Sequence, residues 1–277
     1  GESDWKRVAT RSVDPVSRTA IFDLPDWDSS RSADYRVRLK WQGNDYHWDG
    51  TIRKEPTDRD TLKLACFSCD NGYLFPIPPM VKQVREQDPD MLFFAGDQSY
   101  ESYGGVGVMR GRETDIAIID FMRKFHQFGW TWRELLRDRP SVILPDDHDV
   151  FQGNIWGHGG RKLPMPKTKP DWTLGGYLMP GDWVSAVERM HVGHLPDPAV
   201  DMTLPIGIKP YFTNLNYAGI GFAILEDRKF KTGPKSLPPE KRTRGEGASL
   251  LGAEQEAFLQ RWSNDWDGQN KKRALSQ

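Results

Sequence analysis

The sequence is poor in cysteine, in long apolar runs and in net charge. Only two cysteines occur among 277 residues, which excludes a disulfide framework and leaves the redox compartment open. No apolar run approaches the roughly 20 residues of a transmembrane helix, so we expect no membrane span. Lysine and arginine number 38 against 39 aspartates and glutamates. The resulting net charge of -1 offers no steering field for nucleic acid, and composition says nothing about oligomeric state.

The pattern of predicted secondary structure changes near residue 56. Before it, short alternating segments separated by Asp, Ser and Gly turns predict a small antiparallel β domain, with strands at 19–24, 35–41 and 47–53. After it, strand and helix patterns alternate, which predicts an α/β fold. We therefore divide the chain into a β-rich region, 1–56, and a larger domain, 57–277.

The larger domain is predicted to contain short apolar strands between helices. Strands are expected at 62–68, 91–95, 141–144 and 217–226, and helices at 79–87, 114–126, 132–137 and 251–262. From 147 to 210, Gly and Pro recur every few residues, and the apolar positions follow neither the helical period of about 3.6 residues nor the strand period of about 2. We expect a long functional loop there.

Metal-ligand residues directly follow three of the predicted strands. Cys69 and Asp70 follow the first strand, Asp97 the second, and Asp146–Asp149 the third. Because the carboxyl ends of strands form the binding crevice of an open α/β sheet, we expect these side chains to converge. Carboxylates packed together cost energy unless a cation neutralises them. The pattern therefore predicts a metal site.

Each of these features has a simpler interpretation. Cys66 and Cys69 could form a redox pair or half a zinc site, but there is no second pair, and Cys66 is expected in the core. Asp97 could cap a helix or close a turn, and residues 146–149 could form a solvated turn. The eleven tryptophans are better explained by packing than by ligand binding.

Five segments of the chain carry a family resemblance. They are FSCDNG at 67–72, FFAGDQSYE at 93–101, LPDDHDVFQGNIWG at 144–157, YFTNLNYAGIGFAILEDRKFK at 211–231 and LLGAEQEAFLQRW at 250–262. In this order they resemble the alkaline phosphatase D-like (PhoD-like) branch of the calcineurin-like metallophosphoesterases. The resemblance runs from about residue 45 to the end, and it departs from the family at Gln98, where Tyr is more common.

The resemblance implies both a fold and an activity. The fold is a metallophosphoesterase β-sandwich core flanked by helices and preceded by part of a small immunoglobulin-like β domain. The activity is hydrolysis of phosphomonoesters or phosphodiesters at a centre of iron with calcium, so the expected partner is a small phosphate ester. Together with Gly1 in place of an initiating Met, the resemblance implies a secreted or periplasmic protein.

Carried over by position, the resemblance also assigns roles to residues. Cys69 would be a thiolate ligand, Asp97 a catalytic carboxylate shared between metals, and Asp147 a further metal ligand. Asn154 would add an oxygen ligand, and His148 would be the catalytic acid or transition-state partner. Four more residues are expected close to the metals: Asp146, Asp149, Tyr100 and Glu101.

The implied chemistry agrees with these residue types. Metals roughly 3.5 to 4 Å apart can clamp phosphate oxygens and activate water. Hard oxygen ligands suit calcium, whereas the Cys69 thiolate favours a transition metal. Two other classes stay open: a non-catalytic module that binds glycans through Trp-rich loops, and a phospholipase-like or nucleotide phosphodiesterase.

A last expectation concerns ligands from later strands. The resembled family takes further His and Asp ligands after the strand that ends here at Leu275–Gln277, and the last histidine of this sequence is His194. We therefore expect a fragment with an incomplete metal site, low activity and an exposed sheet edge. The alternative is that a histidine of the chain completes the site: His126, His158, His191 or His194.

Overall fold

The computed structural model describes residues 5–70, 76–103, 110, 114–164, 170–265 and, as backbone, 272–276. Its strands are β1 (Ala33–Trp41), β2 (Asn44–Ile52), β3 (Leu64–Phe67), β4 (Met91–Phe94), β5 (Ser141–Ile143), β6 (Thr213–Tyr217), β7 (Ile220–Ile224) and β8 (Lys272–Ser276). Its α-helices are α1 (Pro78–Gln87), α2 (Thr114–Leu136), α3 (Gly181–Val192), α4 (Pro239–Arg242) and α5 (Ala253–Asn264). Two 3₁₀ turns, Trp172–Leu174 and Pro234–Ser236, complete the described elements.

Strands β3, β4 and β5 form a parallel sheet in that order. Strand β4 is apolar throughout because both of its faces are covered. Leu92 and Phe94 pack with α1 and α2, whereas Met91 points toward the second sheet. Since the three strands run in the same direction, their carboxyl ends meet at one edge of the sheet.

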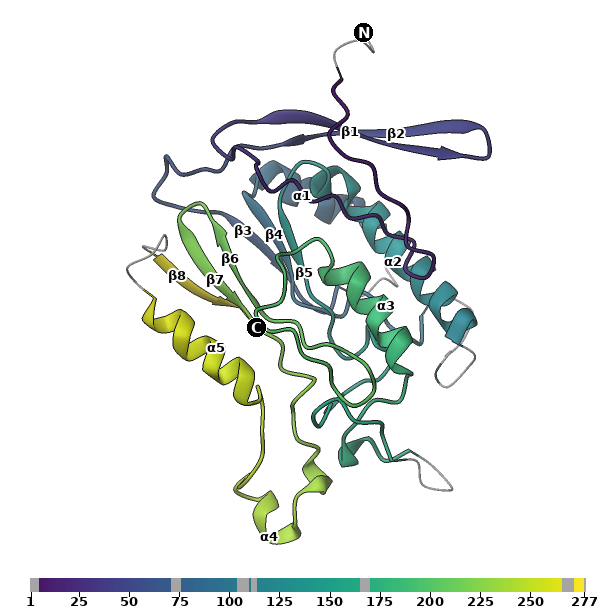
Figure 1. The fold of residues 1–277 in the computed structure, drawn as a ribbon, viewed down its shortest axis with the longest axis vertical. Helices are drawn as coiled ribbons and strands as arrows, with labels where there is room; N and C mark the ends of the chain where they lie inside the picture. Colours follow the sequence, from purple (N-terminus) through teal and green to yellow (C-terminus); the bar gives the residue numbers. More distant parts are fainter. Residues whose placement is uncertain are drawn as a thin grey trace.

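Strands β6, β7 and β8 form the second sheet, in which β7 pairs antiparallel with β6 and parallel with β8. Ala218 and Gly219, both with positive φ, make the two-residue β6–β7 turn. Phe222 and Ile224 pack toward the first sheet, and the alternate residue Ala223 packs with Phe258 of α5. The expected layered α/β fold is therefore confirmed, with two facing sheets and helices outside them (Figure 1).

Strands β1 and β2 form a separate antiparallel hairpin, drawn at the top of Figure 1. The base of the hairpin contacts the body, where the Tyr35 hydroxyl donates to the carbonyl of Arg137 at 2.7 Å. The expected strand at 19–24 is wrong, since these residues have no regular secondary structure. An alternating pattern alone does not supply the backbone hydrogen bonds that a strand needs.

The helices differ from expectation in two places. Helix α2 is continuous through Gly129, because Phe128 and Trp132 are buried on either side of it. That burial outweighs the roughly 1 kcal/mol that glycine costs in a helix. Helix α3 lies within the segment expected to be a loop, and it buries Trp183 and Val187 on one face. No described helix is long and apolar enough to cross a membrane.

One core assignment is also wrong. Cys66 is exposed, as is its neighbour on the same face of β3, Leu64. Strand β3 is at the edge of its sheet. An edge strand covered by helices on one face leaves its alternate residues accessible, which the short apolar run did not reveal.

Candidate metal centre

The loops that follow β4 and β5 approach each other at Gly96. This glycine has φ of 112°, and a Cβ at its position would overlap the Cβ of Asp146. Asp97 follows in the left-handed region with φ of 60°. Only a residue without a side chain permits this approach, which sets the carboxylates of Asp97 and Asp146 side by side.

Three carboxylates converge at this edge and form what we call the acidic cluster: Asp97, Asp146 and Asp147. One oxygen from each lies within 4.8 Å of the others. Burial, together with the neighbouring carboxylates of Asp149 and Asp147, raises the pKa of Asp97. Burial raises the pKa of Asp146 to about 7 even though Arg228 acts to lower it. A bound cation would relieve this repulsion.

Asp149 is fully buried and braces the two loops. Its carboxylate accepts backbone N–H bonds from Asp97 at 2.7 Å, from Ser99 at 2.9 Å and from Asp146 at 2.9 Å. His191 of α3 places Nε2 3.6 Å from the same carboxylate. Because its oxygens already accept these backbone hydrogen bonds, Asp149 holds the two loops that carry the acidic cluster in place and is not itself expected to bind the metal.

His148 is fixed at the rim of the acidic cluster. Its backbone N–H donates to Asp97 Oδ1 at 3.1 Å, and its ring stacks on Tyr100 with centroids 4.3 Å apart. The buried Glu101 carboxylate lies 2.8 Å from His148 Nδ1, so this nitrogen carries a proton as the donor. Arg110 in turn pairs with Glu101. Tyr100 also donates to Asp97 Oδ2 at 3.1 Å.

The remaining expected ligands lie around the same carboxylates. Cys69 has a left-handed backbone, and its N–H donates to the Gly96 carbonyl at 3.1 Å. Its Sγ lies 3.5 Å from Asp97 Oδ2. Asn154 is exposed, and its backbone N–H donates to Asp147 Oδ2. The structure thus brings Cys69, Asp97, Asp147 and His148 together, while the contact it shows for Asn154 runs through the main chain.

Sequence reasoning missed Arg228, the cation of this site. Its Nη2 donates to Asp146 Oδ2 at 2.8 Å, its Nε donates to the other oxygen of Asp146, and Nη2 lies 3.5 Å from Asp147. The residue follows β7 closely. The signal that identified the aspartates, a polar residue after a buried strand, was therefore present in ILEDRKFK as well.

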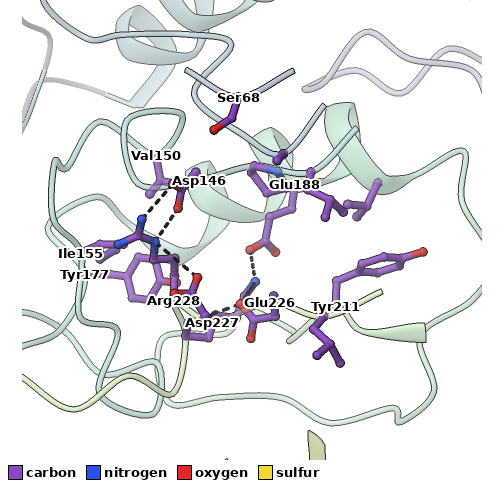
Figure 2. A pocket seen from close by; sticks show the side chains of 16 residues that line it. Ser68, Asp146, Val150, Ile155, Tyr177, Glu188, Tyr211, Glu226, Asp227 and Arg228 are labelled. Carbon is purple, nitrogen blue, oxygen red and sulfur yellow. Dashed lines mark hydrogen bonds and ion pairs between the residues drawn. The ribbon is translucent and has the colours of Figure 1, made fainter. Parts of the chain in front are cut away.

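A cavity of about 320 Å³ adjoins the acidic cluster on the side of the second sheet. Figure 2 shows Arg228 reaching Asp146 at this cavity, with Glu188, Glu226 and Tyr211 also on its wall. Lys229, which also lines it, places Nζ 2.5 Å from Glu188 and 3.4 Å from Glu226. A volume near 300 Å³ is enough to hold a small ligand.

Comparison with known proteins adds evidence on the fold. No family model matches the sequence, and no curated protein matches it. A solved structure entitled "Structure of PhoD" is similar, with a TM-score of 0.57 and 19% sequence identity. The match covers 88% of this chain and 47% of that chain, so this chain spans about half the length of that structure. The described chain therefore has a PhoD-like fold.

Proposed function

We propose that this chain carries a metal centre for phosphoester hydrolysis. The observation that supports it best is the convergence of Asp97, Asp146 and Asp147, whose oxygens lie within 4.8 Å at the carboxyl ends of parallel strands. The Arg228 guanidinium contacts two of these carboxylates, Asp146 and Asp147, and its one positive charge is less than the negative charge that the three carboxylates can carry together. A PhoD-like fold agrees with the proposal.

The residues present fit the implied metals. The carboxylates of the acidic cluster are hard oxygen donors, which suit calcium. The thiol of Cys69 beside Asp97 would complete a mixed sulfur and oxygen set suited to iron, with Asn154 as a further oxygen donor. When bound, the metals supply positive charge that stabilises phosphoryl oxygens and makes water a better nucleophile.

The chain's own residues contribute positioning and proton transfer. Glu101 and Tyr100 hold the His148 ring, and Glu101 fixes the proton on Nδ1. The other ring nitrogen, Nε2, is then the atom that donates a proton to the departing alkoxide when the ring is charged. Tyr100 holds the carboxylate of Asp97 in place through its hydroxyl.

The substrate class is a phosphomonoester or phosphodiester with a small leaving group, for which the adjoining cavity offers room. The separate β1–β2 hairpin supports assignment of residues 1–56 to part of an immunoglobulin-like domain, ahead of a catalytic domain at 57–277. A secreted or periplasmic location belongs to the same proposal.

The test measures metal binding before activity. Calorimetric titration with Ca²⁺ and Fe²⁺ under reducing, anaerobic conditions is expected to show binding that Asp97→Asn weakens, followed by metal-dependent hydrolysis of a chromogenic phosphodiester. Asp201→Asn is the matched control, because Asp201 is exposed, does not belong to the acidic cluster and accepts a hydrogen bond from Lys209 Nζ at 2.7 Å. Equal affinity in the Asp97 variant would refute the proposed site.

A further inference from the structure

Arg228 occupies the position where a cation would act on the acidic cluster. Two of its nitrogens bond the two oxygens of Asp146, and Nη2 approaches Asp147 at 3.5 Å. Side chains of Arg228 and Asp146 are about a quarter exposed, at 24% and 23%, so the pair sits at the cavity wall and not in the core. This forked geometry neutralises one carboxylate and part of a second.

A divalent cation on the same carboxylates would conflict with this arrangement. It would share the oxygens of Asp146 with the guanidinium and place like charges within a few ångströms of each other in a partly buried site. Arg228 has another anchor available, because Nε lies 3.5 Å from Asp227 Oδ1. The adjoining cavity provides the space into which the side chain can turn.

We propose that Arg228 is an internal counter-ion that competes with the metal and, once displaced, binds the phosphoryl oxygens of the substrate. The inference rests on the proposed metal site. Among the described residues that line the cavity, Arg228 and Lys229 carry the positive charges. Lys229 is committed to Glu188 and Glu226, so recognition of a phosphate falls to Arg228. Its planar fork matches phosphate oxygens well.

Arg228→Met tests the proposal, with Lys209→Met as the matched control. Lys209 is exposed and pairs with Asp201 at 2.7 Å, so its removal takes away one positive charge without touching the acidic cluster or Asp227. Calorimetry with Ca²⁺ and Mn²⁺ is expected to show about tenfold tighter binding to Arg228→Met, because no guanidinium has to be displaced. The affinity of Lys209→Met should stay within twofold of the wild type.

The second measurement titrates inorganic phosphate into the proteins saturated with Ca²⁺. Phosphate is expected to bind Arg228→Met about tenfold more weakly, since a charge-assisted forked contact is lost. The combination of tighter metal and weaker phosphate separates the proposal from a structural role. A residue that merely held the loop in place would weaken both when removed. Arg228→Lys, which keeps the charge without the fork, provides a second folded variant and is expected to fall between the two.

The outcomes distinguish this inference from the proposed function. Metal affinity that is unchanged or lower in a folded Arg228→Met overturns the competition while leaving a metal site intact. Unchanged phosphate affinity overturns the second role of Arg228. Binding of metal by Arg228→Met but not by the wild type supports the competition and contradicts the proposed function for this chain. If neither protein binds metal, both proposals fail.

Discussion

Adjacent residues of one loop serve two ion clusters that differ in how their charges are balanced. Arg228 contacts two carboxylates of the acidic cluster, Asp146 and Asp147, and Asp146 also lines the cavity. Lys229 lies between Glu188 and Glu226 in a second group, the lysine cluster, where its side chain is only 4% exposed. Both groups place several carboxylates around one cation, so the presence of buried carboxylates does not by itself identify a functional site.

The lysine cluster can reach neutrality by itself. Burial alone would lower the pKa of Lys229, but the two glutamates raise it overall, so the ammonium stays charged. Burial raises the pKa of Glu226 to about 7, and Lys229 offsets this only in part. One ammonium and one shared proton therefore balance two carboxylates. In the acidic cluster the pKa of Asp146 is also about 7, but one guanidinium and one proton still leave one of the three carboxylates unbalanced, and a metal would supply the missing positive charge.

The largest effect should come from breaking the lysine cluster. Lys229→Met leaves two glutamates buried without their cation and should lower the free energy of unfolding by about 3–5 kcal/mol. Urea denaturation at pH 8 measures the loss, and added Ca²⁺ should not restore it, because the lysine cluster is proposed to have no metal role. A stability change below 1 kcal/mol would contradict the comparison.

The next effect concerns the pH dependence of the same cluster. The pKa of Glu226 rises from its ordinary value of 4.5 to about 7 on folding, so between these values the folded protein binds more protons than the unfolded chain. The free energy of unfolding therefore falls as pH increases through this window. Glu226→Gln removes this titrating group. As the pH rises from 4.5 to 8, the free energy of unfolding of the variant should therefore increase by up to about 3 kcal/mol relative to that of the wild type.

Denaturation curves at several pH values measure this difference, and Glu240→Gln on the exposed helix α4 is the control. A stability difference between the Glu226 variant and the wild type that does not change with pH would show that Glu226 stays ionised in the folded protein.

Asp97→Asn should weaken metal binding without destabilising the fold, whereas a substitution in the core would lower stability. The amide keeps the volume but removes a charge, so metal affinity should fall roughly 100-fold while the folded state keeps or gains stability, since repulsion with Asp147 and Asp149 is relieved. Calorimetry and thermal denaturation together check this. Loss of folding along with metal binding would assign Asp97 a structural role.

His148→Ala should have the smallest effect on the metal. We expect turnover of a chromogenic phosphodiester to fall about 100-fold through loss of the proton donor, while metal affinity changes by less than about threefold. Glu101→Gln should reproduce part of the loss in turnover, because the ring loses its charged partner at Nδ1. A parallel fall in metal affinity would make His148 a ligand.

Much of the sheet and of the site could be predicted from local pattern. The apolar runs at 91–94 and 141–143 identify buried strands, and Asp97 and Asp146–Asp149 follow them directly. Parallel strands of one sheet bring their carboxyl ends to the same edge. The convergence of these side chains could therefore be predicted from their positions directly after the strands. Helix α3 was missed although Trp183 and Val187 have helical spacing, because the flanking Gly and Pro residues masked the period.

The sequence by itself determined which residues carry the chemistry: carboxylates after β4 and β5, and His148 among them. Only the tertiary structure decided their roles. It turned Asp149 inward as a brace against His191, brought Arg228 across 82 residues to Asp146, and enclosed Lys229 with Glu188. Strand and helix patterns repeat over a few residues and are readable locally, whereas the pairing of charges depends on which loops packing brings within a few ångströms of each other.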